Sequence, residues 1–373
     1  MLRVMSVFGT RPEAIKMAPL IKELERRDWI QSIVCVTAQH RQMLDQVLET
    51  FHITPDYDLN IMKQGQSLSD ITISALRGLE EVVLTAKPDL ILVHGDTTTT
   101  FAGALAAFYQ QVAVGHVEAG LRTDNKYSPF PEEMNRQMVD RLSDLLFAPT
   151  YLSRDNLLKE NIPAERIIVT GNTAIDAMAT TINQDYQHPE LNWIKTGERL
   201  LMLTAHRREN LGEPMHRIFR AIRRVTEDVP DVKVIYPVHL NPLVREAAKA
   251  ELGECDRVHL IEPLEVLDFH NFLNRANIIL TDSGGIQEEA PSLGKPVLVL
   301  RDTTERPEGI NAGTLKLVGT DEEVIYHETM RLLTDSEEYR CMSLASNPYG
   351  DGHASERIAN AIETWGRNKL SDI

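Results

Sequence analysis

The sequence of 373 residues is poor in cysteine and has no long apolar run. Its three cysteines, Cys35, Cys255 and Cys341, are odd in number and widely spaced, which excludes a disulfide framework and a cysteine-based zinc motif. No stretch approaches the roughly 20 apolar residues of a membrane span. The apolar start is too short for a secretory signal and predicts a first strand over 2–8 instead. We therefore expect a cytoplasmic protein with no membrane partner.

Positive charge is also scarce. Lys and Arg number 39 against 55 Asp and Glu, which gives a formal net charge of -16. A protein that binds the phosphate backbone of nucleic acids needs a basic face, so the composition argues against a nucleic-acid partner. A small anionic ligand stays compatible with this charge, because a few well-placed Arg and Lys side chains suffice for it.

What the sequence does contain is a regular alternation of short apolar runs and longer amphipathic ones. Unbroken runs such as LILVH favour parallel strands covered by helices on both faces. Repetition of strand, helix and strand predicts the α/β class, with two Rossmann-like domains built on doubly wound parallel sheets. Strands are predicted at 2–8, 33–37, 90–94, 112–116, 145–148, 167–170, 200–204, 232–236, 258–261, 278–280 and 297–300.

The length of the chain also favours two domains, since single cores rarely grow beyond about 250–300 residues. The polar stretch 180–198 has no clear periodicity and is expected to be irregular structure near the domain boundary. We expect an N-terminal domain over 1–172 and a C-terminal nucleotide-binding domain over 173–354. The last helix, over 355–373, is expected to pack back on the first domain.

Polar clusters follow the predicted strands of the first domain, where open α/β sheets bind ligands. The segment GTRPEAIK lacks the GxGxxG fingerprint of dinucleotide-binding domains, but its turn amides, Arg11 and Lys16 could hold an anion. Asp96 and Glu118 follow later strands and Glu132 opens a helix, so we expect three carboxylates near one sheet edge. Such a group supplies the base and the acid of a proton transfer. Helix capping by Asp96 and dipole complementation by Glu132 are the structural alternatives.

The second domain carries its own polar clusters. AHRREN places His206 and Arg207 after its first strand, and YPVHLNP places His239 after the next one. TDSGGIQEE is a strand end, a Ser-Gly-Gly turn and a helix start, whose amides favour a diphosphate. Glu289, one helical turn further on, could accept hydrogen bonds from ribose hydroxyls.

Together these segments resemble the bacterial non-hydrolysing UDP-N-acetylglucosamine 2-epimerases. The resemblance runs from the first strand to the last helix and rests on GTRPEAIKMAPL, HGDTTTTFAGALAAFY, GHVEAGLRT, YSPFPEEMNRQ, AHRRENLGEP, YPVHLNP, TDSGGIQEEAPSLGKPVLVLRDTTERPEG and NPYGDG. It implies two domains facing a cleft, as in the GT-B glycosyltransferases, a homodimer, and catalysis with no cofactor and no metal.

The resemblance also implies a reaction, the reversible interconversion of UDP-GlcNAc and UDP-ManNAc. The sugar C2 proton is removed and UDP departs, which leaves bound 2-acetamidoglucal. UDP then adds back, and a proton reaches the other face of C2. An isomerase of this kind feeds the synthesis of cell-surface polysaccharides.

Individual roles follow from the motif matches. Asp96, Glu118 and Glu132 match the family's acid/base carboxylates and His206 its active-site histidine, but the sequence does not assign a proton to each carboxylate. The positions that match substrate contacts are Arg11, Lys16, Arg136, Phe269, Ser283, Gly284, Gly285, Glu289 and Arg306. Parts of a second UDP-GlcNAc site, where the substrate acts as an activator, are matched by Gln39, Gln42, Glu132, Arg207 and His239. For Glu132, this second site is the alternative to a catalytic role. Gly65 departs from the arginine expected in that second site.

Three other functions remain open from the residues. A hydrolysing epimerase would release free ManNAc and UDP. A GT-B glycosyltransferase would use the Ser-Gly-Gly turn and Glu289, but it would leave three carboxylates without a role. A UDP-sugar sensor would bind the nucleotide and need none of Asp96, Glu118 or Glu132. The carboxylates therefore favour an epimerase, and its product separates the two epimerase classes.

Overall fold

The computed structural model describes residues 1–38, 41–63, 65–304 and 306–371. Its contacts divide the chain into two compact units. Unit 1 comprises Met1–Thr180 and Tyr349–Ile373, and unit 2 comprises Thr181–Pro348. Unit 1 is therefore made from two segments that are distant in the sequence, whereas unit 2 is one continuous segment.

Unit 1 is built on a seven-stranded parallel sheet in the order β3-β2-β1-β4-β5-β6-β7. Its strands are β1 (Leu2–Phe8), β2 (Ile30–Val36), β3 (Tyr57–Asp58), β4 (Leu90–His94), β5 (Ala113–Val117), β6 (Leu145–Ala148) and β7 (Ile167–Val169). Its helices are α1 (Arg11–Glu25), α2 (Arg41–Thr50), α3 (Leu68–Ala86), α4 (Thr98–Tyr109), α5 (Glu132–Leu142), α6 (Tyr151–Lys159), α7 (Thr173–Thr181) and α15 (Ala354–Ser371).

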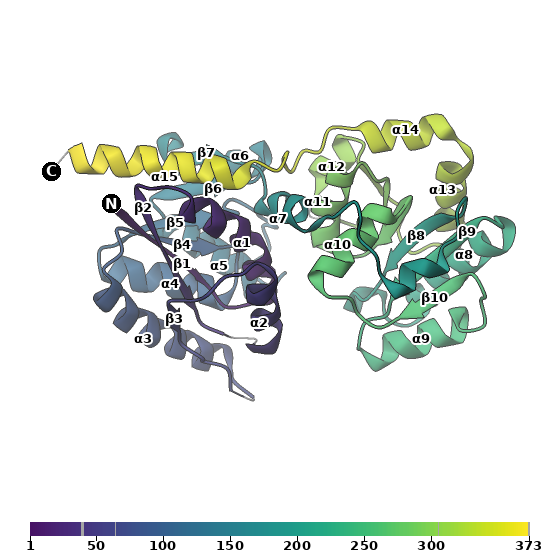
Figure 1. Ribbon diagram of the computed structural model, residues 1–373, viewed down its shortest axis with the longest axis horizontal. Coiled ribbons are helices and arrows are strands. Elements are labelled where there is room, and N and C mark those ends of the chain that lie inside the picture. Colours follow the sequence, from purple (N-terminus) through teal and green to yellow (C-terminus); the bar gives the residue numbers. More distant parts are fainter. Residues whose placement is uncertain (39–40, 64, 305, 372–373) are drawn as a thin grey trace. The chain divides into compact units, whose positions relative to one another are not determined.

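The first strand shows why this sheet is buried on both faces. Val4 and Phe8 in β1 belong to a core that includes side chains of α1, α2 and α15. Met5 and Val7 point to the opposite face and join a core with α3, α4 and α5. Because side chains alternate along a strand, a sheet covered on both faces needs apolar residues at consecutive positions. Figure 1 shows α15, in yellow, lying beside α1, and these two helices are in contact.

Helix α7 joins the two segments of unit 1. Asp176 in this helix accepts hydrogen bonds from the backbone nitrogens of Ala354 (3.2 Å) and Ser355 (2.7 Å), which begin α15. A boundary at 172/173 would separate α7 from this contact. The division between the units lies at the end of α7 instead.

Unit 2 contains a six-stranded parallel sheet in the order β10-β9-β8-β11-β12-β13. Its strands are β8 (Arg199–Thr204), β9 (Val232–Pro237), β10 (Val258–Ile261), β11 (Ile278–Thr281), β12 (Val297–Val299) and β13 (Leu315–Leu317). Its helices are α8 (Glu213–Asp228), α9 (Pro242–Leu252), α10 (Val266–Arg275), α11 (Gly284–Glu289), α12 (Pro307–Asn311), α13 (Glu322–Thr334) and α14 (Ser336–Leu344). The predicted fold class, parallel doubly wound α/β, is confirmed for both units.

Both sheets reverse their strand order beside their first strand, between β1 and β4 in unit 1 and between β8 and β11 in unit 2. Ligands of open α/β sheets bind outside the carboxyl ends of the strands at such a reversal. The segments that leave β1, β4 and β5 in unit 1, and β8 and β11 in unit 2, are therefore the ones to inspect.

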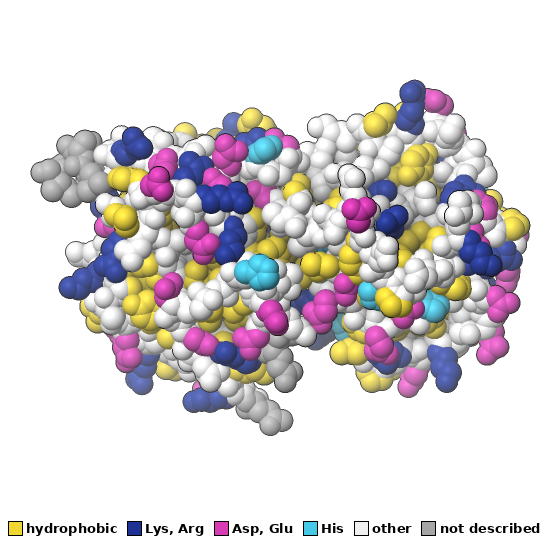
Figure 2. Space-filling model, viewed as in Figure 1, with side chains coloured by type: hydrophobic (Ala, Val, Ile, Leu, Met, Phe, Trp, Pro, Cys, Tyr) yellow, Lys and Arg dark blue, Asp and Glu magenta, His cyan; other side chains and the backbone are white. Residues whose placement is uncertain are grey.

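The surface of each unit mixes charges of both signs. On the face shown in Figure 2, Lys and Arg side chains lie among Asp and Glu side chains, and no large area of one sign is visible in this view. Among the described residues, no helix is both long enough and apolar enough to cross a membrane.

Candidate active site

A buried carboxylate joins the first two turns of the unit 1 site. Oε2 of Glu13 accepts hydrogen bonds from the backbone nitrogens of Gly9 (3.0 Å) and Thr10 (2.7 Å), and Oε1 accepts one from the hydroxyl of Thr97 (2.6 Å). Burial raises the pKa of Glu13, and these hydrogen bonds partly oppose that shift. Thr97 also caps α4. Glu13 therefore connects the start of α1, which carries Arg11 and Lys16, with the turn that follows Asp96.

Glu118 lies at the centre of the polar groups of unit 1. Its Oε2 atom forms an ion pair with Lys16, accepts a hydrogen bond from Nδ2 of Asn172 (3.1 Å), and lies 3.7 Å from Nε2 of His94. The backbone of Glu118 has a φ of 69°, in the region that favours glycine. A non-glycine residue in such a conformation costs on the order of 1–3 kcal/mol, and strain of this kind is concentrated at functional sites.

His94 is an uncharged neighbour of Glu118. The side chain is buried, and burial lowers its pKa to about 3, although Glu118 acts in the opposite direction. Lys16 and His116 lower the pKa of His94 further. The ring is therefore neutral at physiological pH. Lys16, and not His94, supplies the positive charge that pairs with Glu118.

The low pKa of His94 predicts an acid-sensitive fold. Between pH 6.5 and about pH 3, the unfolded residue binds a proton and the folded one does not, so stability falls as the pH falls. One such proton contributes about 1.4 kcal/mol per pH unit. We expect urea unfolding of a His94→Gln variant to depend less on pH, between pH 7 and pH 5, than that of the parent. Equal pH dependence in both proteins would mean that folding does not lower the pKa of His94.

Asp96 is held by the start of α5. Its Oδ2 atom lies 2.5 Å from Nη2 of Arg136, and its backbone oxygen accepts a hydrogen bond from Nδ2 of Asn135 (2.8 Å). Gly95 precedes Asp96, and a Cβ atom at Gly95 would lie 3.9 Å from Oε1 of Glu118. Asp96 and Glu118 therefore belong to neighbouring turns at one edge of the sheet.

Glu132 and Arg11 each open a helix of unit 1. Glu132 is the first residue of α5 and half-buried, and Arg11 is the first residue of α1 and half-buried. Within the described part of the chain, neither side chain has a hydrogen bond or ion pair. Both helices start at the same edge of the sheet as Asp96 and Glu118, so the topology places both residues at that edge.

A buried ion-pair network lies beneath these turns. His116 contacts Oδ1 of Asp140 through Nδ1 (2.6 Å) and the backbone oxygen of Gly95 through Nε2 (2.7 Å). Oδ2 of Asp140 accepts from Nη2 of Arg122 (2.7 Å) and from the backbone nitrogen of Gly120 (3.2 Å). Burial acts to raise the pKa of Asp140, but His116 and Arg122 outweigh it and lower the pKa. The network thus ties the turns after β4 and β5 to helix α5.

In unit 2, the turn after β8 is organised by a buried aspartate. Oδ2 of Asp282 accepts hydrogen bonds from the backbone nitrogens of His206 (2.8 Å) and Arg207 (2.9 Å). The rings of His206 and His239 stack, with centroids 5.2 Å apart and an interplanar angle of 11°. A cavity of about 480 Å³ in this region is lined by His206, Arg207, Arg208, Glu209, His239 and Asn241.

The Ser-Gly-Gly turn lies after β11, next to Arg306. Nε of Arg306 donates to Oε1 of Glu288 (2.7 Å). A Cβ atom at Gly284 would lie 2.7 Å from Nη1 of Arg306, so the absence of a side chain there lets the guanidinium approach the turn. Oε2 of Glu289 lies 4.0 Å from Nε2 of His270. The turn thus has a cation beside it and a carboxylate one helical turn away.

The remaining sequence-predicted residues of unit 2 are Phe269 and Ser283. Phe269 is half-buried in α10, and Ser283 immediately precedes α11. The backbone nitrogen of Ser283 donates to Oγ1 of Thr281 (3.0 Å), which fixes the turn at the end of β11. The nucleotide-binding role of either residue stays a prediction.

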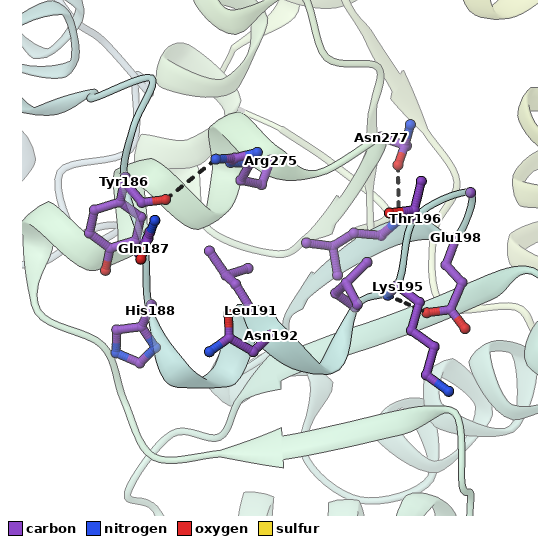
Figure 3. Close-up of a pocket in the computed structure, with 13 residues that line it drawn as sticks. Tyr186, Gln187, His188, Leu191, Asn192, Lys195, Thr196, Glu198, Arg275 and Asn277 are labelled. Carbon is purple, nitrogen blue, oxygen red and sulfur yellow. Dashed lines mark hydrogen bonds between the residues drawn. The ribbon is translucent and has the colours of Figure 1, made fainter.

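A second cavity of unit 2 lies at the other end of the sheet. It has a volume of about 540 Å³ and is lined by Tyr186, His188, Lys195, Arg275, Asn277 and neighbouring residues (Figure 3). Nη2 of Arg275 donates to the backbone oxygen of Tyr186 (3.3 Å), and Oδ1 of Asn277 accepts from the backbone nitrogen of Leu200 (2.9 Å). Because Leu200 and Asn277 lie at the amino ends of β8 and β11, this cavity is separate from the groups at the carboxyl ends.

The sequence matches a known protein family over most of its length. The model of the family described as UDP-N-acetylglucosamine 2-epimerase matches residues 22–363. The chain belongs to this family. The family's enzymes are isomerases, and the enzyme class predicted from the sequence is therefore confirmed.

Individual members of the epimerase family are similar over nearly their whole length. UDP-N-acetylglucosamine 2-epimerase of Bacillus subtilis is 67% identical over 361 residues, which cover 97% of this chain and 95% of the relative. The enzyme of Escherichia coli K12 is 53% identical over 378 residues, which cover 99% of this chain and 100% of the relative. A crystal structure of the Neisseria meningitidis enzyme bound to UDP-GlcNAc has a TM-score of 0.90 and 51% identity, and the similarity covers 97% of this chain and 100% of that one.

Two positions predicted for an activator site cannot be placed. Gln39 lies outside the described residues, and so does the side chain of Gln42, whose backbone is part of α2. Gly65 is described, with a φ of 75° and no atom within 4 Å of a Cβ position. Among the described residues, no group of three or more His, Cys, Asp or Glu is arranged to hold a metal ion.

The structure adds residues that the sequence reasoning did not single out. These are Glu13, His94, Asn172, the His116–Asp140–Arg122 network and Asp282. Their common property is burial of a polar side chain beside a predicted site residue. One signal was available, since His94 and His116 precede Asp96 and Glu118 by two residues each in HGD and HVE.

Proposed function

We propose that the protein is a non-hydrolysing epimerase that interconverts UDP-GlcNAc and UDP-ManNAc. The observation that carries the proposal is the environment of Glu118, a carboxylate with a positive φ that contacts Lys16 and Asn172 and approaches Gly95, the residue before Asp96. A sensor or a glycosyltransferase has no need for two ionisable carboxylates in neighbouring turns. The UDP-GlcNAc bound by the Neisseria meningitidis relative supports the substrate.

The chemistry of the first half-reaction is an elimination. A carboxylate of unit 1 takes the C2 proton, the C1–O bond breaks with its electron pair going to the diphosphate, and a C1–C2 double bond forms. No carbonyl activates the C2–H bond, so the step depends on positive charge developing at C1. The second half-reaction reverses these events, with a proton delivered to the opposite face of C2. Asp96, Glu118 and Glu132 are the proposed acid/base groups of the two halves.

Unit 2 supplies the contacts to the nucleotide in this proposal. His206 and Arg306 stabilise the charge on the departing diphosphate, and the turn Ser283–Gly285 offers its backbone nitrogens. Glu289 accepts hydrogen bonds from ribose hydroxyls, and Phe269 packs by the uracil. In unit 1, Arg11, Lys16 and Arg136 contact the substrate. The product UDP-ManNAc then serves cell-surface polysaccharide synthesis.

The test is proton NMR of the purified protein with UDP-GlcNAc in D2O, without added cofactor or metal. We expect UDP-ManNAc that carries deuterium at C2, because the abstracted proton exchanges with solvent before it returns. Free ManNAc and UDP as products would assign the chain to the hydrolysing class. An unchanged spectrum under conditions where UDP binding is measured would contradict the proposal.

We further propose that the enzyme is a homodimer and that a second UDP-GlcNAc activates it at Arg207 and His239. Both residues line the 480 Å³ cavity of unit 2, which supports a ligand there. The reaction from pure UDP-ManNAc separates the possibilities. Activation predicts a lag that a trace of UDP-GlcNAc removes, whereas linear progress without the trace would contradict it.

A further inference from the structure

The two oxygens of the buried Asp282 carboxylate differ in the number of hydrogen bonds that they accept. Oδ2 accepts three hydrogen bonds, from the backbone nitrogens of His206 and Arg207 and from Nδ2 of Asn210 (3.0 Å). Oδ1 accepts none from the described residues, although the side chain is completely buried. A buried acceptor without a donor costs about 1–3 kcal/mol. The Nδ1 atom of the His206 ring lies 3.5 Å from Oδ1.

The surroundings of His206 favour the neutral form of its ring. Burial lowers the pKa of His206, and the Asp282 carboxylate only partly opposes that effect. The other charged or titratable groups around the ring are His239, Arg207 and Glu209, with Arg208 in the same cavity. The ring of His239 and the guanidinium of Arg207 disfavour a positive charge on His206, so the buried Oδ1 atom of Asp282 faces a ring whose charged form is not favoured.

We propose that binding of the nucleotide diphosphate draws a proton from solvent onto His206. Asp282 is the positioning residue, and it accepts a hydrogen bond from the resulting imidazolium. This inference rests on the proposed function, which brings a diphosphate to His206. The imidazolium donates from Nδ1 to Oδ1 of Asp282 and from Nε2 to a phosphoryl oxygen. No bond forms other than the new N–H bond, and the buffer supplies the proton.

The consequence for the reaction is a cation that exists only when the diphosphate is present. Asp282 fixes which ring nitrogen faces inward, so the other nitrogen faces the ligand. The positively charged ring of His206, directed at the phosphoryl oxygens, stabilises UDP as it leaves the sugar. The ring loses its proton again when UDP departs from the protein.

Calorimetric titration with UDP at about pH 8, in two buffers of different ionisation enthalpy, measures the protons taken up. At this pH the UDP phosphates are fully ionised, since their last pKa is about 6, and release none. We expect net uptake by the parent protein and none by His206→Gln. We also expect no uptake by Asp282→Asn. Its amide oxygen can accept the three hydrogen bonds that Oδ2 accepts, and its NH2 group donates to Nδ1 of His206. An Nδ1 atom that accepts a hydrogen bond carries no proton, so the His206 ring stays neutral. His327→Gln, at an exposed histidine of α13 in the same unit, is the matched control and should retain uptake.

The outcomes separate this inference from the proposed function. No uptake by a parent protein that binds UDP overturns the inference, and uptake that persists in Asp282→Asn overturns the role of Asp282. Failure of the parent to bind UDP counts against the proposed function instead. If Asp282→Asn does not fold, as judged by circular dichroism, the decision rests on His206→Gln, whose side chain is 37% exposed. Uptake that persists in His206→Gln would also overturn the inference.

Discussion

Asp96→Asn and Glu118→Gln are each expected to lower kcat by roughly 10²–10⁴-fold, the usual contribution of a positioned proton-transfer group. Both substitutions preserve shape and remove the ionisable oxygen. The amide oxygen of Glu118→Gln can still accept from Lys16 and Asn172, so the turn should keep its conformation. UDP binding, which the proposal assigns to unit 2, should change little. The measurements are NMR turnover and calorimetric titration with UDP.

Matched controls for these variants are Asp28→Asn and Glu165→Gln, which change exposed carboxylates of the same unit. They should retain the parent's rate. The variants also assign each proton, because a variant that still forms 2-acetamidoglucal from UDP-GlcNAc must retain the base for that sugar. Near-parental turnover by either active-site variant would show that its carboxylate does not transfer the proton.

Asp140→Ala is expected to destabilise unit 1 by about 3–5 kcal/mol, the typical cost of removing one partner from a buried ion pair. The substitution leaves Arg122 and His116 without the carboxylate that both contact, and all three side chains are at most 3% exposed. The backbone nitrogen of Gly120 loses an acceptor as well. The free energy of unfolding in urea measures the effect.

The positions of the three tryptophans allow the unfolding of unit 1 to be followed separately by fluorescence. Trp29 and Trp365 lie in unit 1 and Trp193 in unit 2, so a Trp193→Phe background makes the fluorescence report unit 1 alone. The control is Asp155→Ala, which removes an exposed pair with Arg154 and should cost less than about 1 kcal/mol. A loss for Asp140→Ala no larger than for this control would show that the buried network contributes little to stability.

Much of the fold is predictable because apolar runs determine both strands and burial. The run LILVH coincides with β4, and the first strand was predicted with the bounds that β1 has. The strands that escaped prediction are β3, which has two residues, and β13, whose sequence is LKL. Neither contains a continuous apolar run. Within the stretch 180–198, expected to be irregular, Pro189–Trp193 forms a short 3-10 helix.

The site was predictable only where chemistry follows a strand directly. Asp96, Glu118 and Ser283 occur at strand ends in recognisable motifs, and parallel topology brings such ends together. Glu13 and Asp282 escaped because their importance comes from partners distant in the sequence. Glu13 bonds Thr97 across 84 positions, and Asp282 bonds His206 across 76. Burial of these carboxylates depends on the assembled sheet, which no local pattern encodes.

The two-segment construction of unit 1 has a consequence for the order of events during synthesis. Ile358 and Ile362 of α15 complete the core beside α1, yet they are synthesised only after the whole of unit 2. Unit 2, a continuous segment, is fully synthesised before then and can finish folding first, although the first segment of unit 1 precedes it in the chain. Unit 1 must wait for its final helix with one apolar face exposed. Because Asn172 bonds the backbone of Tyr349 (2.7 Å), a short linker in place of unit 2 could reconnect the two segments and remove that delay.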